Sequence, residues 1–302
     1  MNKSYIIKEV YSGMRIDRWI RNNIAFLPQS LIEKSLRKGK IKVNIKKVNS
    51  SYKLKTGDKI KFFNFTFEIN KNKKTNKKFS PSTELLKVHE NRILENNDDF
   101  IVIDKSPGVP VQGGTKSKKN LIDILASSEF FKDTKPFPVH RLDKETSGIM
   151  IISKNHNSAR LLTTLFRLRK IHKTYLAICH GTFKNKKGEI RGNLVKYENE
   201  KKISELAITN YNVISSNNFY SFLELKPITG RKHQLRKQLS FMGNPIVGDK
   251  KYNIIKTKNK DEKKLMLHAY KIKFLINNKK FNFEAKPPSY FNNFLNKKRL
   301  II

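Results

Sequence analysis

Length, composition and charge limit what this chain can bind. It has 302 residues, enough for one large domain and a small one. Its 64 lysines and arginines outnumber 25 aspartates and glutamates and give a formal net charge of +39. Such a charge favours polyanions, because each neutralised phosphate releases counterions. Most of the cations are lysines, however, in a chain also rich in asparagine and isoleucine, as A+T-rich codon usage produces. The charge alone therefore does not decide for nucleic acid.

Several classes of protein are excluded. The single cysteine, Cys179, allows no internal disulfide and fits a reducing cytoplasm. One cysteine and seven scattered histidines give no zinc-ligand spacing. No apolar run approaches the roughly 18 residues of a membrane-spanning helix. The N-terminus lacks the long apolar region of a signal peptide. We therefore expect a cytoplasmic protein without a metal site.

Residues 1–69 predict a small domain of two helices and a hairpin. In the first helix, apolar residues recur at helical spacing: Ile16, Trp19, Ile20 and Ile24. A second helix follows Pro28, with Ser30 and Glu33 as a capping box and Gly39 at its end. Its predicted inward-facing residues are Leu31, Ile32 and Leu36. A half-buried strand is indicated by the alternating apolar residues Ile41, Val43 and Ile45. A turn at residues 56–58 leads into a further strand.

Residues 70–84 separate this segment from the rest of the chain. They are basic, polar and nearly free of large apolar groups, so they cannot bury enough surface to offset the entropy of ordering. We predict a flexible linker, which serves either as a solvated spacer or as a basic tether on RNA. Residues 85–302 then form a second, larger domain.

The larger domain is predicted to mix helices and strands. Phe100–Ile103 is a strand, and the loop over Lys105–Gly114 lacks the spacing of a nucleotide-binding loop. Ser158–Lys170 is a helix, and His172–Ile178 alternates as a strand. The predicted core residues of that helix are Leu161, Leu162, Leu165 and Leu168.

The segment His140–Gly148 carries the most specific signal. It places Asp143 between the cations Arg141 and Lys144, ahead of an apolar run over residues 149–152. That run predicts a buried strand, so a loop presents Asp143 at the edge of a sheet. A loop aspartate by itself more often caps a turn or pairs with a neighbouring arginine. Presented in a cleft, the same carboxylate can act as a nucleophile or a base.

Two further segments carry candidate site residues. Tyr175 lies in a strand pattern, where a tyrosine is usually half-buried packing but also offers a hydroxyl for proton transfer. The segment from Thr229 to Arg236 predicts a glycine-containing turn into a helix, with His233 and Gln234 as its caps. Even if His233 and Gln234 cap this helix, Arg231 and Arg236 remain available to bind an anion.

Together these segments resemble the RluA/RluC/RluD family of pseudouridine synthases. The strings that carry the resemblance are H-R-L-D-x-x-T-S-G, K-x-Y-x-A, T-G-R-x-H-Q-x-R and G-x-P-I-x-G-D, and it covers about residues 14–292. The chain departs from the family pattern at Pro107, which stands one place late, and at Lys232 and Asn244, which replace threonine and histidine. None of these positions carries the implied chemistry.

The resemblance implies roles for the candidate residues. Asp143 is the catalytic carboxylate, Tyr175 stacks on the target uracil, and Arg236 pairs with Asp143 in a two-pronged contact. Arg141 enters the base stack that the flipped uridine leaves, and Arg231 contacts a substrate phosphate. The substrate-binding residues are thus Arg141, Arg231 and His140, the last of which also shapes the loop. The sequence leaves open whether Asp143 attacks the ribose, attacks uracil C6 or abstracts a proton from C2′.

The resemblance also implies a fold. We expect an α+β catalytic domain with a mixed, largely antiparallel central sheet and an active-site cleft. The N-terminal segment resembles an S4 domain, a small helix–helix–hairpin RNA-binding module, over roughly residues 14–65. This implies that a cluster of cations contacts phosphates: Arg15, Arg18, Arg37, Lys38, Lys40 and Lys42.

We therefore expect an RNA pseudouridine synthase of the RluC branch, which modifies several separate uridines in 23S ribosomal RNA of the large subunit. The reaction is an isomerisation without redox change, so no cofactor or metal is expected. The expected partner is 23S ribosomal RNA, with no membrane, and the chain is expected to be a monomer. Two alternatives stay open: the RluD branch, acting on another helix of that RNA, and a non-catalytic ribosome-assembly protein. A pure binding protein needs none of Asp143, Tyr175 and Arg236, which favours the enzyme.

Overall fold

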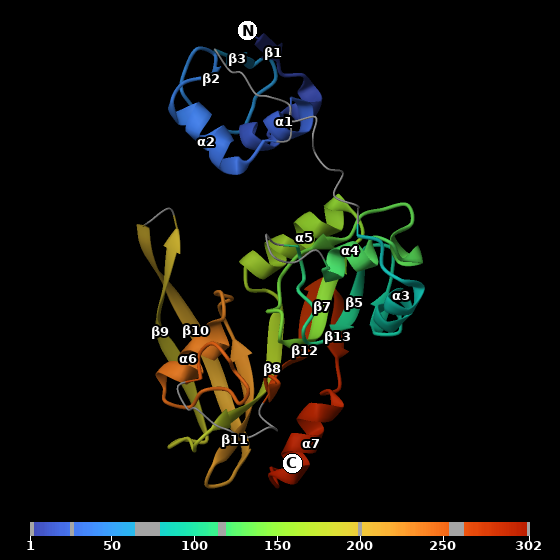
Figure 1. Cartoon of the computed structure of the whole chain (residues 1–302), viewed down its shortest axis with the longest axis vertical. Helices are drawn as coiled ribbons and strands as arrows, with labels where there is room; N and C mark the ends of the chain where they lie inside the picture. Colours follow the sequence, from blue (N-terminus) through green and yellow to red (C-terminus); the bar gives the residue numbers. More distant parts are fainter. Residues whose placement is uncertain are drawn as a thin grey trace. The chain divides into compact units, whose positions relative to one another are not determined.

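The computed structural model divides into two compact units, residues 1–78 and 79–302 (Figure 1). It describes residues 3–24, 27–63, 79–113, 119–198, 201–253 and 263–300. In these parts of the chain no helix is both long and apolar enough to cross a membrane. Most of the predicted linker, residues 70–78, lies outside the described residues. Its last two residues, Thr83 and Glu84, already belong to a helix, because Ser82 caps that helix by accepting a hydrogen bond from the Leu85 amide.

The N-terminal unit is a three-stranded antiparallel sheet with two helices, in the predicted order helix, helix, hairpin. Its elements are β1 (Lys3–Ile6), η1 (Glu9–Tyr11), α1 (Ile16–Asn23), α2 (Gln29–Arg37), β2 (Ile41–Val43) and β3 (Lys59–Phe62). The strands lie in the order β1-β3-β2. The predicted inward face of α1 is confirmed for Ile16, Trp19 and Ile20, which are at most 3% exposed. The strand β1 was not predicted; it completes the sheet beside β3.

Three local predictions in this unit are wrong. Ser30 does not cap α2, because the helix begins one residue earlier, after Pro28, whose fixed φ suits the position before a helix. Leu31 is 39% exposed. The strand predicted through Ile45 ends at Val43, since the next two residues have positive φ and form a two-residue turn. Asn44 stabilises that turn through hydrogen bonds of its side chain to Asp58 and to the Lys59 amide.

The second unit is built on one large sheet, and the predicted mixed, largely antiparallel α+β fold is confirmed. Its strands lie in the order β4-β5-β7-β12-β8-β11-β10-β9, with β13 beside β12 and β6 beside β7. All of these pairs are antiparallel except β7 with β12. The strands are β4 (Ile93–Asn96), β5 (Phe100–Lys105), β6 (Phe137–Pro138), β7 (Ser147–Ser153), β8 (His172–His180), β9 (Lys187–Glu198), β10 (Lys201–Ser216), β11 (Tyr220–Pro227), β12 (Leu267–Ile276) and β13 (Lys279–Glu284).

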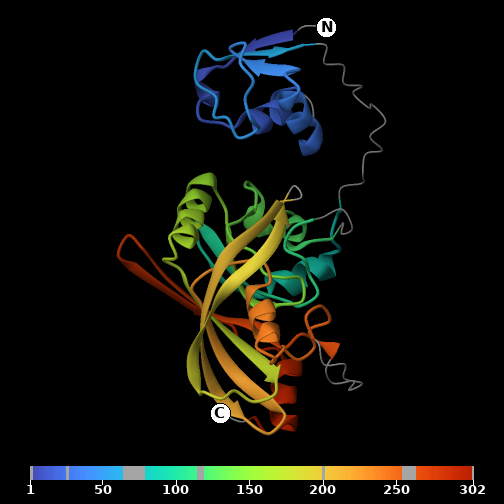
Figure 2. The ribbon, with the colours of Figure 1, turned by 90° about the vertical axis from the view of Figure 1, so that its left-hand side faces the viewer.

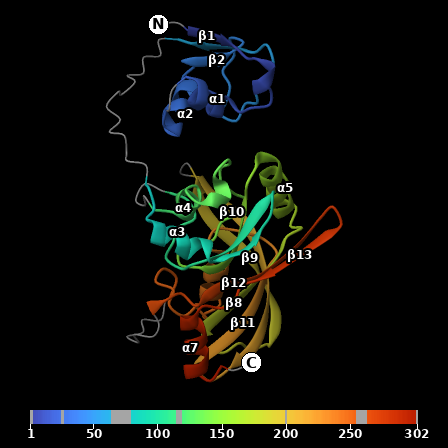
Figure 3. The same cartoon turned by 90° about the vertical axis from the view of Figure 1, so that its right-hand side faces the viewer.

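The helices of this unit cover both faces of the sheet. They are α3 (Thr83–Glu90), α4 (Leu121–Leu125), α5 (His156–Arg167), α6 (Gln234–Phe241) and α7 (Ser289–Lys297), with a short η2 (Glu129–Phe131). Along β7, Ile149 and Ile151 pack with α5 on one face, whereas Met150 and Ile152 pack with α4 on the other. At the other end of the sheet, α6 and α7 pack together with β8 and β11 (Figure 1). β9 and β10 form a long twisted ribbon (Figure 2), and the β12–β13 hairpin projects from the unit (Figure 3).

The predicted elements of this unit are largely confirmed. Phe100–Ile103 lies in β5 and His172–Ile178 in β8. The predicted helix over residues 158–170 is α5, which begins earlier because Asn155 caps it by accepting a hydrogen bond from the Ser158 amide. It ends at Arg167, because Arg169 has a positive φ and the Lys170 amide donates back to the Leu165 carbonyl. Leu162 is buried as predicted, but Leu161 and Leu168 are 42% and 58% exposed.

Gly148 allows the close approach that fixes the loop before β7. It has a φ of +107° and pairs with Ala269 where β7 and β12 run parallel. A Cβ at this position would lie 2.2 Å from the carbonyl oxygen of Ala269. Only glycine therefore fits here, and the loop that carries Asp143 ends at a defined point at the centre of the sheet.

Candidate active site

A cavity of about 560 Å³ opens beside the Asp143 loop, a volume typical of a small-ligand pocket. Its walls come from the loop 139–143, the C-terminal end of α5, the pocket-facing side of β8 and the segment 227–236. Asp143, Tyr175 and Arg236 all line it, so the prediction that three separate motifs meet in one pocket is confirmed.

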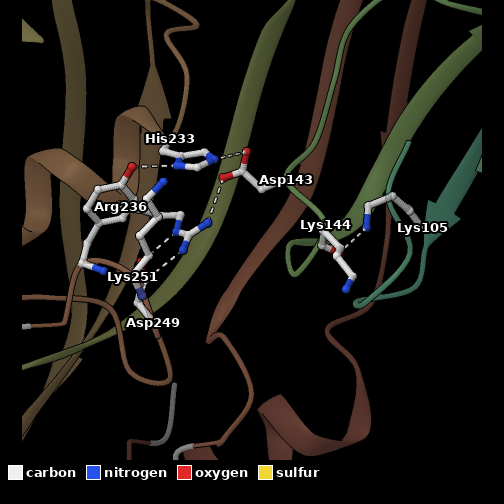
Figure 4. A network of polar contacts seen from close by, with 8 residues as sticks. Lys105, Asp143, Lys144, His233, Arg236, Asp249 and Lys251 are labelled. Carbon is white, nitrogen blue, oxygen red and sulfur yellow. Dashed lines mark hydrogen bonds and ion pairs between the residues drawn. The ribbon is translucent and has the colours of Figure 1, made fainter. Parts of the chain in front are cut away.

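Asp143 lies between two nitrogen donors (Figure 4). Its Oδ2 is 3.3 Å from Nη1 of Arg236, and its Oδ1 is 3.4 Å from Nε2 of His233. Arg236 is 93 residues away in the chain, and the predicted salt-bridge distance is confirmed. Both contacts are longer than a strong charge-assisted hydrogen bond. The carboxylate is thus oriented without being tightly bound.

The two-pronged contact predicted for Arg236 goes to Asp249 instead of Asp143. Nε and Nη2 of Arg236 donate to the two oxygens of Asp249, each at 2.7 Å. The amides of Lys251 and Tyr252 donate to the same carboxylate at 2.9 and 3.0 Å. Burial would raise the pKa of Asp249, but these hydrogen bonds lower it below its ordinary value. The guanidinium fork is therefore occupied by a buried carboxylate, and one remaining nitrogen faces Asp143.

His233 is the residue whose role the sequence missed. It was predicted as a helix cap, yet its side chain makes no capping hydrogen bond. Its φ of +55° turns the ring toward the pocket, where Nδ1 lies 2.7 Å from the Tyr252 hydroxyl. Burial and the neighbouring cations lower the pKa of His233, while Asp143 opposes this. A neutral imidazole with the proton on Nε2 fits both neighbours, because a carboxylate only accepts and a hydroxyl can donate to Nδ1.

The sequence contains two signals for this cluster. The string H-Q-x-R places a histidine and an arginine three residues apart at a helix start, and the G-D string supplies Asp249. The sequence does not show which carboxylate, Asp143 or Asp249, forms the two-pronged contact with Arg236.

Tyr175 lines the pocket from β8, which is consistent with a position against a base. Burial and the charge of Asp143 both raise the pKa of the Tyr175 phenol. It is therefore neutral at physiological pH, and an aromatic ring with a neutral hydroxyl faces the cavity.

The loop that carries Asp143 is held by its backbone. Lys105 is fully buried, and its ammonium donates to the carbonyl oxygens of Ser106, Val109 and Lys144 at 2.9, 3.0 and 3.1 Å (Figure 4). Burial lowers the pKa of Lys105 to about 7. Three donated hydrogen bonds require the protonated amine. The residue after Asp143 is thus anchored to the end of β5.

His140 shapes the loop from its other end. Its Nε2 accepts a hydrogen bond from the Ile151 amide at 2.9 Å, and its ring stacks on Phe166 at 4.5 Å. Burial and the charge of Lys173 lower the pKa of His140 to about 3, so the ring stays neutral. The ring lines the pocket, but its polar contact is to the backbone of β7.

The two arginines predicted to bind substrate, Arg141 and Arg231, differ in their contacts with the protein. Arg141 is exposed and lines the pocket. Arg231 also lines the pocket, but its Nη1 is 3.2 Å from a carboxylate oxygen of Glu205 and its Nε donates to the Leu206 carbonyl. Arg231 is thus not free for a phosphate in this structure.

The predicted cations of the N-terminal unit are mostly exposed. Arg15 pairs with Asp17 at 2.7 Å, and the ammonium of Lys42 lies 5.3 Å from the ring centre of Phe63. The others of the cluster are exposed: Arg18, Arg37, Lys38 and Lys40.

Comparison with known proteins agrees with this geometry. A family model described as RNA pseudouridylate synthase matches residues 99–241, which include the Asp143 loop and α6. The ribosomal large subunit pseudouridine synthase C of Rickettsia felis is 36% identical over 295 residues, covering 92% of this chain and 94% of the relative. The synthase of that name from Vibrio vulnificus is 32% identical and covers 89% and 87%. The chain therefore belongs to the RNA pseudouridylate synthase family.

Solved structures support the same fold. The human RNA Pseudouridylate Synthase Domain Containing 4 protein superposes with a TM-score of 0.62 at 28% identity, over 72% of this chain and 96% of that one. The human Domain Containing 1 protein gives a TM-score of 0.57 at 22% identity, over 70% and 87%.

Proposed function

We propose that this protein converts specific uridines of 23S ribosomal RNA to pseudouridine, as the RluC-type relatives are named to do for the large subunit. The observation that carries the proposal is the placement of Asp143 in a pocket, between His233 and Arg236, with Tyr175 lining the same pocket. The compartment that this substrate implies is the cytoplasm, and the chain acts as a monomer without a cofactor.

The chemistry is an exchange of one bond for another. The N1–C1′ glycosidic bond breaks, the uracil turns over, and a C5–C1′ bond forms; the proton lost from C5 is matched by one gained at N1. Nothing is oxidised or lost, and a positioned carboxylate supplies the nucleophile or base that starts the exchange. Asp143 takes that role here, because Arg236 and His233 hold its carboxylate from two sides inside the pocket.

The other residues of the pocket position the nucleotide. The target uridine must leave its stack, at a cost of a few kcal/mol. Arg141, exposed next to Asp143, fills the vacated space, and Tyr175 receives the uracil. Arg236, held by Asp249, keeps the Asp143 carboxylate oriented.

Mapping pseudouridines tests the proposal directly. Ribosomal RNA from cells with and without this protein is compared position by position, and unmodified 23S transcript is then treated with the purified chain. Several separate uridines should be converted. Conversion of uridines in only one helix would favour an RluD-type target set, and no conversion of any large-subunit uridine would refute the proposal.

We further propose that the N-terminal unit is an S4 domain that contacts RNA. The order of two helices and a hairpin and its exposed cations support this. A chain shortened to begin at Phe79 keeps the Ser82 cap and should fold, because the unit from 79 has its own core. It should bind 23S transcript more weakly, and the log–log salt slope of binding should flatten by about 0.7–0.9 for each lost phosphate contact. Equal affinity and slope would remove the S4 proposal.

A further inference from the structure

A second cationic cluster lies in the pocket, away from Asp143. Lys173 is on β8, two residues before Tyr175, so both side chains lie on the same face of the strand and about 7 Å apart along it. Lys173 and Arg169, which follows α5, both line the cavity. Lys173 is the first residue of the K-x-Y-x-A string, but neither cation was assigned a role from the sequence.

Lys173 has no protein partner within the described parts of the chain. It makes no hydrogen bond or ion pair there, although it is half-buried. Two other cations of the pocket lining have carboxylate partners: Arg236 pairs with Asp249 and Asp143, and Arg231 pairs with Glu205. A partly desolvated ammonium is costly unless an anion accompanies it, so an external partner accounts for its retention.

The surroundings of Lys173 leave room for such a partner. A Cβ added to Gly230 would have the Nζ of Lys173 as its nearest neighbour, 3.9 Å away, so the space over Gly230 is otherwise open. Burial and the charge of Arg169 lower the pKa of Lys173 to about 8. Asp143 is the single carboxylate among the described lining residues, and it faces His233 and Arg236 instead.

We propose that Lys173, with Arg169 beside it, forms a phosphate-binding subsite that holds one phosphodiester group next to the nucleotide whose base lies against Tyr175. The inference rests on the proposed function, because it takes the occupant of the pocket to be a nucleotide of RNA. It moves the contact with substrate phosphate from Arg231, the residue implied by family resemblance, to Lys173. In this arrangement the half-buried Lys173 gains an anionic partner when RNA enters the pocket.

Three full-length variants separate the possibilities. Lys173→Met removes the ammonium but keeps the length of the side chain, and Lys173→Arg restores a charge. Lys273→Met is the matched control, because Lys273 is exposed on β12 opposite His172 and therefore projects from the other face of the sheet. Thermal unfolding of all three checks the fold.

Binding of unmodified 23S transcript is measured over a series of salt concentrations. Lys173→Met should weaken binding about tenfold, as expected for loss of one hydrogen bond to a charged group, and flatten the log–log salt slope by about 0.7–0.9. Lys173→Arg should recover most of both effects, and Lys273→Met should match the wild type. If Lys173→Met equals Lys273→Met in affinity and slope, the subsite is refuted. A fourth variant, Arg231→Gln, tests the residue that the family resemblance implies. If Arg231→Gln flattens the salt slope and Lys173→Met does not, the subsite is also refuted.

A second measurement locates the phosphate. RNA oligonucleotides around a converted uridine carry one neutral methylphosphonate at each flanking position in turn. One such substitution should lower kcat/KM about tenfold for the wild type and have no further effect on Lys173→Met. Additive effects at every position would overturn the subsite. The measurement of RNA binding over a series of salt concentrations tests Lys173 even if the wild type converts no uridine. Failure of the proposed function therefore remains distinguishable from failure of this inference.

Discussion

The wall of the pocket that carries Arg236 is held by charged side chains, whereas the wall that carries Asp143 is held by backbone hydrogen bonds. On the α6 wall (His233, Arg236, Asp249 and Tyr252), Asp249 is completely buried and takes the guanidinium fork. On the loop wall (Asp143 with its anchors Lys105 and His140), both anchors bond to main-chain atoms. Within the described residues, the Asp143 side chain makes the two long contacts across the cavity and no others.

This difference suits the two kinds of group in the pocket, the cation that stabilises charge and the carboxylate that reacts. A group that stabilises charge works best when it is fixed in advance, because no reorganisation is then needed. A group that attacks or takes a proton must keep its lone pairs accessible. Backbone anchoring fixes where the loop lies without occupying the carboxylate oxygens. The following variants test that division of labour.

The largest effect is expected from Asp143→Asn. The amide keeps the shape of the side chain but is neither a nucleophile nor a base, so turnover should fall by at least about a hundredfold. RNA binding and the unfolding temperature should change little, since Asp143 makes no strong contact. Pseudouridine formation in single-turnover assays gives the rate. A variant that retains more than about a hundredth of the wild-type rate would contradict the role.

Arg236→Ala should cost both activity and stability. It leaves Asp249 as a buried carboxylate without its partner, a loss typically of about 3–5 kcal/mol. The pKa of Asp249 is lowered in the folded chain, so its pairing stabilises the fold above the unfolded value of 3.8 and is lost as pH falls through the folded value. The difference in the free energy of unfolding between wild type and variant should therefore be largest at neutral pH and become smaller in acid.

Chemical denaturation at several pH values measures this difference. Arg191→Ala is the control, because Arg191 pairs with Glu189 in an exposed position, where such a pair contributes about 0–1 kcal/mol. Arg236→Lys should recover only part of the loss, since an ammonium cannot reproduce the fork. Equal destabilisation by the Arg191 and Arg236 variants would show that the α6 wall is not held by its ion pair.

On the loop wall, Lys105→Met should separate activity from stability. Removing three hydrogen bonds frees the carbonyl of Lys144 and loosens the loop, so we expect turnover to fall about tenfold. The pKa of Lys105 falls from 10.5 to about 7 on folding, so between these values the unfolded chain binds more protons. The wild-type free energy of unfolding should thus rise with pH across this range relative to that of the variant, by up to about 5 kcal/mol.

Activity assays and denaturation from pH 6 to 10 follow both effects. Lys144→Met is the matched control. In the described part of the chain the exposed side chain of Lys144 pairs with Glu145 alone, at 3.9 Å, whereas Lys105 binds the carbonyl oxygen of Lys144. A similar loss of activity in both variants would refute the anchor.

The same two walls show how far the sequence could go. The motif strings predicted that Asp143, Tyr175 and Arg236 meet in one pocket. This was possible because a resemblance over most of the chain implies the topology of the family's fold. The partner of the arginine fork could not be inferred, since Asp249 and Asp143 are both carboxylates and only the packed structure decides which one is nearer. Lys105 looked like part of a proline–glycine loop, and nothing local reveals that its side chain turns inward.

Local geometry was the other limit. Ser30 and Glu33 had the spacing of a capping box, yet Pro28 started the helix earlier. Leu161 and Leu168 fitted a helical stripe, yet both are exposed, and Leu168 follows the last residue of α5. Periodicity predicted the elements, and tertiary contacts decided their ends and faces.

The smallest effect is expected from Tyr252→Phe on the α6 wall. The change removes the hydroxyl that lies 2.7 Å from Nδ1 of His233 and keeps the ring, which lies 5.2 Å from the guanidinium carbon of Arg236. Loss of this hydrogen bond costs about 0.5–1.5 kcal/mol, so kcat should fall roughly two- to tenfold with KM unchanged. Tyr290→Phe is the control, since the contacts of the Tyr290 hydroxyl with described residues are long, 3.5 Å to Ser147 and to the Leu265 carbonyl. If Tyr252→Phe leaves kcat at the wild-type value, the orientation of His233 does not depend on its hydroxyl partner. The preorganisation of the α6 wall would then rest on the Arg236–Asp249 pair alone.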